Sequence, residues 1–186
     1  MSYYSQCGED KWIEENLHPQ VGTFCEVGAY NGVLSSNTLH FEEQGWRGIL
    51  IEPDPLLATY CRDKRSNSKV FCCAAGYPGI SMFPINEADR GLSGFNRPGK
   101  PIPVIIVPLW QILSFFSTQG INLLSIDTEG TELEVWETVG FYRPEIVLME
   151  YQTCDEPPKD KLIVERMART GYKEVHRTQY NLIFTR

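Results

Sequence analysis

The feature that most constrains the fold is a short apolar run that ends in a glycine-containing turn. Residues 22–28 are typical of a buried strand, and Gly28 and Gly32 lie in the turn that follows. A second apolar run, 48–52, ends about twenty residues later in the acid Glu52. Strands that are followed by polar turns at their carboxyl ends are typical of an open α/β sheet, which binds its ligand at that edge. The pattern therefore predicts a nucleotide-type pocket there.

The spacing of the glycines indicates which ligand the pocket takes. A pyrophosphate-binding turn has the pattern G-x-G-x-x-G, whereas here three residues separate Gly28 from Gly32 and Glu26 precedes both. An acid at this position repels phosphate but suits a ligand that carries an amino group. Glu52 is placed to accept hydrogen bonds from ribose hydroxyls. S-adenosylmethionine meets these requirements, because it has a sulfonium, an ammonium and a ribose but no phosphate.

Strands and helices alternate along most of the chain. Apolar runs predict strands at 22–28, 48–52, 69–74, 80–84, 121–126, 146–149, 172–176 and 181–185. Helical periodicity and capping residues predict helices at 8–17, 35–44, from Pro55, from Pro108, at 131–139 and at 159–169. The last two strands are joined by a turn too short for a crossover, so they should pair antiparallel. We expect a Rossmann-like α/β fold with a mainly parallel seven-stranded sheet, an antiparallel C-terminal strand and helices on both faces.

Composition favours one globular domain over residues 1–186, with an N-terminal helical segment at 1–20. The chain has 186 residues, 42% of them hydrophobic, and a net charge of −7. This acidity argues against nucleic acid as a partner, and the basic cluster at residues 62–65 is interpreted as a helix end. No apolar stretch is long enough to span a membrane. The six cysteines form no C-x-x-C pair, which favours a reduced, cytoplasmic protein.

Three acids near the carboxyl ends of the fourth and fifth central strands are the candidate catalytic residues. Asp127 ends the strand at 121–126, Glu150 ends the strand at 146–149, and Glu129 lies two residues beyond Asp127. If S-adenosylmethionine donates its methyl group to a hydroxyl of a second molecule, the acceptor, a carboxylate here would remove the proton of that hydroxyl. This role requires that burial or another acid raises the pKa of the carboxyl group. Mg²⁺ between two carboxylates is the alternative that these residues leave open, but the sequence predicts no metal site.

Residues 86–103 contain three glycines and three prolines without periodicity, which predicts a loop. Because long loops at a ligand edge often act in binding, we interpret it as a candidate lid. The residues expected to cover the acceptor are Arg90, Ser93, Phe95, Asn96 and Arg97.

Several motifs in order along the chain resemble the FkbM-type family of S-adenosylmethionine-dependent methyltransferases. They are Ser5-Gln6-Cys7-Gly8-Glu9-Asp10, Glu26-Val27-Gly28-Ala29-Tyr30-Asn31-Gly32, Ser36-Asn37-Thr38, Gly45-Trp46-Arg47-Gly48, Ile51-Glu52-Pro53, Ala74-Ala75-Gly76 and Ser125-Ile126-Asp127-Thr128-Glu129-Gly130-Thr131-Glu132, with Glu150 after them. One departure is Glu26, where the family often has Asp. The resemblance implies a class I methyltransferase fold and the following cofactor-binding residues: Gln6, Glu26, Gly28, Ala29, Tyr30, Asn31, Gly32, Ser36, Asn37, Glu52, Pro53, Ala74, Ala75 and Asp127.

The resemblance also implies the reaction, which is O-methylation of a hydroxyl on a small metabolite or sugar-like acceptor. Glu26 is expected to hold the methionine ammonium directly or through water. Three alternatives stay open: a non-catalytic S-adenosylmethionine-binding scaffold, an NAD-dependent oxidoreductase with a degenerate glycine turn, and methyl transfer to nitrogen.

Overall fold

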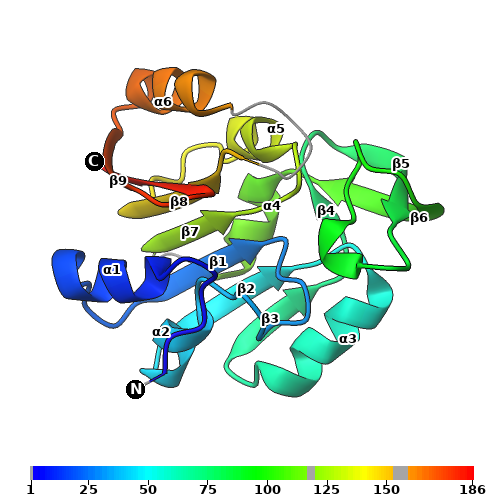
Figure 1. Ribbon diagram of the computed structural model, residues 1–186, viewed down its shortest axis with the longest axis horizontal. Helices are drawn as coiled ribbons and strands as arrows, with labels where there is room; N and C mark the ends of the chain where they lie inside the picture. The colour runs from blue at the N-terminus through cyan, green and yellow to red at the C-terminus, as the bar shows by residue number, and fades with distance from the viewer. Residues whose placement is uncertain (1, 117–119, 153–158) are drawn as a thin grey trace.

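The computed structural model describes residues 2–116, 120–152 and 159–186, and its centre is a seven-stranded sheet (Figure 1). In spatial order the strands are β3 (Ser68–Phe71), β2 (Arg47–Ile51), β1 (Thr23–Val27), β7 (Leu123–Ile126), β8 (Ile146–Glu150), β10 (Asn181–Thr185) and β9 (Lys173–Arg177). The first five strands are parallel, and β10 runs antiparallel to both β8 and β9. The predicted fold class is confirmed.

Helices cover both faces of this sheet. They are α1 (Glu9–Leu17), α2 (Leu39–Glu43), α3 (Pro55–Lys64), α4 (Leu109–Leu113), α5 (Glu132–Glu137) and α6 (Asp160–Arg169), with 3₁₀ turns η1 (Arg90–Leu92) and η2 (Ser114–Phe116). None of these described helices is both long and apolar enough to cross a membrane.

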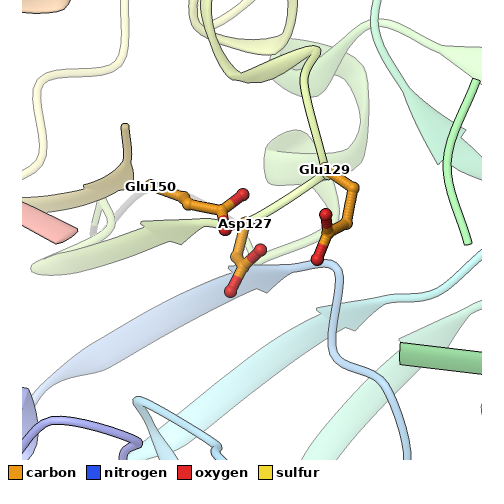
Figure 2. A group of neighbouring side chains, drawn as sticks. All are labelled: Asp127, Glu129 and Glu150. Atoms are coloured by element: carbon orange, nitrogen blue, oxygen red, sulfur yellow. The ribbon is translucent and has the colours of Figure 1, made fainter. Parts of the chain in front are cut away.

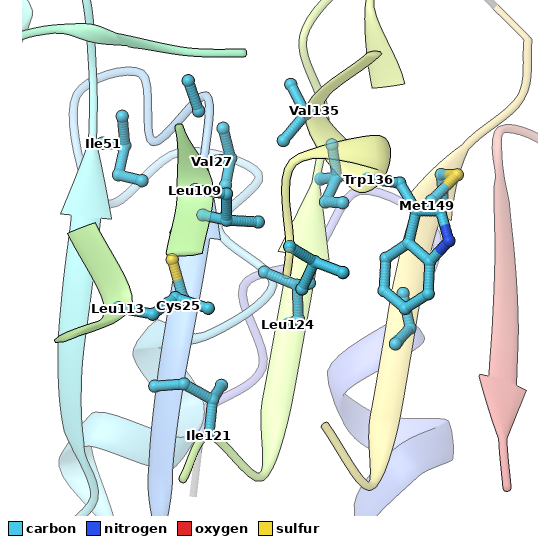
Figure 3. Close-up of a cluster of buried hydrophobic side chains, with 14 of the residues drawn as sticks. Cys25, Val27, Ile51, Leu109, Leu113, Ile121, Leu124, Val135, Trp136 and Met149 are labelled. Carbon is cyan, nitrogen blue, oxygen red and sulfur yellow. The ribbon is translucent and has the colours of Figure 1, made fainter. Parts of the chain in front are cut away.

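Alternation of side chains along the strands produces two hydrophobic cores. On β1, Cys25 and Val27 face the core beneath α4, α5 and α6 (Figure 3), whereas Phe24 faces the core beneath α1 and α2. Because successive side chains of a strand point to opposite faces and both faces are covered, the central strands are mostly apolar, with Glu26 on β1 and Ser125 on β7 as polar exceptions. Most of the polar groups of the candidate site therefore lie at or near the carboxyl ends of these strands.

A second, three-stranded sheet lies beyond the carboxyl edge, and the sequence did not predict it. Its strands, in spatial order, are β4 (Ala74–Ala75), β6 (Lys100–Val107) and β5 (Gly79–Ile85). The predicted loop 86–103 is therefore too long, because residues 100–103 belong to β6. Pro101 and Pro103 do not break this strand, because β4 pairs only with Ile106 and Val107 and leaves one side of the prolines without a partner strand.

One other prediction in this half of the chain was wrong, and one was incomplete. The helix expected at 35–44 begins only at Leu39, because Ser36 and Thr38 donate hydrogen bonds to Glu26. Residues 62–65 form the end of α3 as predicted, but the side chain of Arg65 there is fully buried, which the sequence did not indicate. In both cases a charged group inside the protein determines the local structure.

Candidate active site

A cavity of about 290 Å³ opens at the carboxyl edge of the large sheet, where the predicted site residues meet. Its walls come from the ends of β1, β2, β7 and β8, from the small sheet and from the loop between β5 and β6. Of the predicted residues, the following line it: Gln6, Glu26, Gly28, Ala29, Tyr30, Ser36, Asn37, Glu52, Pro53, Ala74, Ala75, Asp127, Glu129 and Glu150. Asn31 and Gly32 are not among the lining residues.

Gly28 allows the first turn to pass close to the neighbouring strand end. Its φ is +83°, and a Cβ placed there would lie 1.7 Å from the carbonyl oxygen of Asp127. No side chain fits that gap, and the positive φ separately favours glycine. Glycine at this position therefore keeps the end of β1 and the end of β7 in direct backbone contact, with the cavity beside them.

Glu52 lies at the end of β2 as a buried carboxyl group that faces the cavity wall. One oxygen accepts a hydrogen bond from the backbone amide of Tyr30 and the other from that of Asp54, both at 2.9 Å. Burial raises the pKa of Glu52 to about 8, against the opposing effect of these two amides. Since a carboxylate offers about four acceptor positions, two remain for a ligand that brings hydroxyl donors.

Glu26 lies at the centre of a buried polar network. It accepts hydrogen bonds from Ser36 Oγ at 2.9 Å, from the amide of Asn37 at 2.8 Å and from Thr38 Oγ1 at 2.6 Å. Arg65 adds an ion pair at 3.5 Å from below. Much of the hydrogen-bonding capacity of this carboxylate thus serves to hold residues 36–38 against the sheet.

Arg65 is the residue of this network that sequence analysis missed. Its guanidinium also pairs with Glu42 at 2.7 Å and donates to the carbonyl oxygen of Gly32 at 2.8 Å. Gly32, with φ at +78°, approaches the α3 residue Cys61 closely. The side chain of Asn31 accepts hydrogen bonds from the backbone amides of Val33 and Leu34. Asn31 and Gly32 thus shape the loop from behind the cavity wall.

Three carboxylates converge at the ends of β7 and β8 (Figure 2). The register pairs Ile126 with Met149, so Asp127 and Glu150, each the next residue, lie side by side at the sheet edge. Glu129 approaches from the following turn, and one oxygen from each of the three groups lies within 4.8 Å of the others. The predicted convergence of these acids is therefore present in the structure.

Burial and mutual repulsion change the acidity of this cluster. Desolvation is the largest cause that raises the pKa of both Asp127 and Glu150, and neighbouring carboxylates add to it. The shift is larger for Glu150.

Glu129 has a φ of +56° and pairs with Arg97, whereas Glu132 accepts the amides of Thr128 and Gly130. Glu132 therefore organises the turn that presents Glu129.

The N-terminal Ser5–Asp10 motif fastens Gln6 beside the cavity. Asp10 accepts hydrogen bonds from the amide and hydroxyl of Ser5, and a backbone bridge joins Ser5 to Ser35. Glu9 accepts a hydrogen bond from Asn181 on β10 at 2.9 Å. Both acids of the motif are buried and structural, so they position the segment that carries Gln6.

The β5–β6 loop, residues 86–99, is fastened near both sides of the cavity. Arg90 pairs with Asp54 at the start of α3, and Arg97 pairs with Glu129 beyond β7. Of the five residues predicted to cover the acceptor, Arg90, Ser93 and Phe95 line the cavity, whereas Asn96 and Arg97 are not among the lining residues.

Other wall residues were missed because the sequence contains no local signal for them. Phe83 packs edge-on against Phe95, with ring centroids 5.2 Å apart. Gln152 follows β8, and Tyr180 lies in the turn between β9 and β10. Only the folded arrangement of the two sheets brings these side chains to one cavity.

The residues that line the cavity suit S-adenosylmethionine in charge and in chemical character. Six acidic side chains line it and the only basic one among the described residues is Arg90, which suits a ligand with cationic sulfur and an ammonium group. Glu52 has acceptor positions for the two ribose hydroxyls. Pro53, Ala74 and Ala75 offer small apolar surfaces on which a planar base can lie.

The strand order, the glycine turn and the acid at the end of β2 define a Rossmann-like methyltransferase. A family model described as "Methyltransferase FkbM domain" matches residues 26–174. The chain belongs to this FkbM family of S-adenosylmethionine-dependent methyltransferases.

Solved structures give the same fold at low sequence identity. A TehB-like SAM-dependent methyltransferase from Corynebacterium glutamicum has a TM-score of 0.56 and 11% identity, covering 98% of this chain and 89% of its own. Precorrin-6y C5,15-methyltransferase from Geobacter metallireducens has a TM-score of 0.55 and 14% identity, covering 95% of this chain and 87% of its own. No curated protein matches the sequence.

Proposed function

We propose that the protein transfers the methyl group of S-adenosylmethionine to a hydroxyl of a small metabolite or sugar-like acceptor. The observation that carries the proposal is the pair of carboxyl groups, Asp127 and Glu150, side by side in the cavity that fits the cofactor. A hydroxyl is a poor nucleophile until its proton is removed, and a carboxylate within reach can receive that proton. Transfer to nitrogen needs less help of this kind.

The chain's own residues divide the work between binding and proton removal. Glu52 accepts hydrogen bonds from the ribose, and Gly28 gives the methionine part close access to the backbone. Since Glu26 is engaged with residues 36–38, its contact with the ammonium passes through Ser36, Asn37 or water. When bound, the cofactor supplies a methyl group on cationic sulfur. Asp127 and Glu150 hold the acceptor hydroxyl and take up its proton.

The first test concerns the cofactor and needs no acceptor. Calorimetry with S-adenosylmethionine, S-adenosylhomocysteine and NAD should show binding of the first two and none of NAD. Glu52→Gln should weaken binding roughly tenfold or more, because the amide puts a donor group in place of an oxygen that accepts a ribose hydroxyl. Glu87→Gln, an exposed acid of the β5–β6 loop, is the matched control and should bind normally. Binding of NAD in preference would support the oxidoreductase alternative.

The second test separates an enzyme from a cofactor-binding scaffold. Radiolabelled methyl transfer to a panel of polyols, sugars and glycosides should give an ether product. Asp127→Asn should lower turnover at least a hundredfold, which is within the usual contribution of a general base. Product with a methylated amine, or turnover that is unaffected in this variant, would contradict proton removal by the pair.

A further inference from the structure

One oxygen of the carboxylate cluster has no partner. Glu150 is 7% exposed, and its Oε2 atom makes no hydrogen bond in the structure. A buried carboxylate oxygen without a partner carries the full cost of its desolvation. The atom belongs to the group whose ligand-type oxygens converge with those of Asp127 and Glu129 (Figure 2). This part of the cavity therefore favours a positively charged partner.

Among the residues that the structure describes, no cationic side chain fills this position. Arg97 pairs with Glu129, and Lys159 donates to the carbonyl oxygen of Gly130. No Lys or Arg among the described residues pairs with Asp127 or Glu150, and the remaining ten residues of the sequence include neither Lys nor Arg. Of the other nearby acids, Glu26 is held by Arg65, and Glu132 accepts backbone amides. The Asp127–Glu150 pair therefore has to take its positive charge from elsewhere.

We propose that the carboxylates of Asp127 and Glu150, with Glu129 as a third ligand, bind a hard divalent cation of the Mg²⁺ type. All three groups offer oxygen, which Mg²⁺ and Ca²⁺ prefer, and the cluster contains no thiol or imidazole to favour zinc. A six-coordinate ion with ligands at 2.0–2.1 Å needs oxygens roughly 3 to 4.2 Å apart, which agrees with the upper limit of 4.8 Å after a small adjustment.

All three carboxylates line the cavity, so water or the acceptor's oxygen would complete the coordination of the ion there. A cation there would orient the hydroxyl of the acceptor beside the cofactor. This part of the inference rests on the proposed O-methylation, whereas binding of the ion itself does not. The competing occupant is a proton shared between Asp127 and Glu150, and the experiment is arranged to distinguish the two.

Mn²⁺ is the probe, because its free and bound forms differ in their electron paramagnetic resonance. We expect saturable binding of one Mn²⁺ per chain to the 186-residue protein, with and without S-adenosylhomocysteine, and displacement by Mg²⁺. Asp127→Asn and Glu150→Gln should each weaken binding at least tenfold. Glu134→Gln is the control, since this acid is exposed on the nearby helix α5, and it should bind normally.

Thermal unfolding gives a second readout that covers variants of reduced stability. Mg²⁺ should raise the melting temperature of the natural protein and of Glu134→Gln but not that of Glu150→Gln. No saturable Mn²⁺ binding, or equal binding by all the variants, would overturn the proposal. The proposal would also be overturned if the Glu150→Gln protein were more stable than the natural one both with and without Mg²⁺. The amide imitates a protonated acid, so this result would assign the site to a shared proton. If the protein binds the cofactor but no metal, the metal site is excluded and the proposed function stands. If it binds the metal but not the cofactor, the metal site stands and the proposed function does not.

Discussion

The guanidinium of Arg65 lies 3.5 Å from the carboxylate of Glu26, and both side chains are buried beneath the loop of residues 28–38. The same guanidinium contacts Glu42, so one cation serves two acids that approach it from different elements. It also holds the carbonyl oxygen of Gly32. The loop that frames the cavity is thus supported by a residue that does not line the cavity.

Removing this cation should destabilise the protein strongly. Arg65→Met leaves Glu26 and Glu42 buried without their shared cation, and breaking a buried ion pair in this way costs about 3–5 kcal/mol. Urea denaturation measures the loss. Arg62→Met, on an exposed position of the same helix, should change the free energy of unfolding by less than about 0.5 kcal/mol. Similar effects of the two substitutions would show that the network contributes little.

Alanine at Gly28 should abolish cofactor binding and reduce stability by more than backbone strain alone explains. Gly45→Ala is the matched control, because Gly45 has a φ of +93° but no atom within 4 Å of its would-be Cβ. The control should cost about 1–2 kcal/mol, which is the usual penalty for a left-handed residue. The excess loss in Gly28→Ala measures the clash with Asp127. Equal losses in the two variants would mean that the turn relaxes to accommodate a Cβ.

Glu52 should make stability depend on pH in a definite direction. Its pKa rises from 4.5 to about 8 on folding, so the folded state keeps a proton that the unfolded state loses. The free energy of unfolding should therefore decrease as the pH rises from about 4.5 to 8. Urea denaturation across this range checks the slope. Glu52→Gln should flatten it in part, since Asp127 and Glu150 contribute with the same sign. An unchanged slope in the variant would contradict the assignment.

The β5–β6 loop should open more readily when Arg90 is removed. Arg90→Gln breaks the ion pair with the buried Asp54, whereas Lys100→Gln breaks an exposed pair at the end of the same loop. We expect cleavage within residues 86–99 by a limiting protease to be several times faster in the first variant only. S-adenosylhomocysteine should slow cleavage of the natural protein. A lid would be contradicted if S-adenosylhomocysteine did not slow cleavage of the natural protein. It would also be contradicted if the natural protein, Arg90→Gln and Lys100→Gln were cleaved at the same rate.

Local patterns were sufficient to predict the large sheet and most of the cavity wall. Apolar runs located the central strands, and glycines and acids at their ends located Gly28, Glu52 and Asp127. The role of Arg65 could not be predicted, because its partners Glu26 and Glu42 lie on other elements, 39 and 23 residues away. The small sheet was missed because prolines in β6 are typical of a loop. They are compatible with a strand here because this part of β6 pairs with β5 on one side only, which the sequence does not reveal.

Asp54 gives the β5–β6 loop an influence beyond the cavity. Its Oδ1 atom caps the first turn of α3 through the amide of Leu56, and its Oδ2 atom receives Arg90. Detaching the loop therefore leaves a helix-capping carboxylate without its counter-ion. Opening of the β5–β6 loop is therefore expected to loosen the first turn of α3 as well, because both depend on the same side chain.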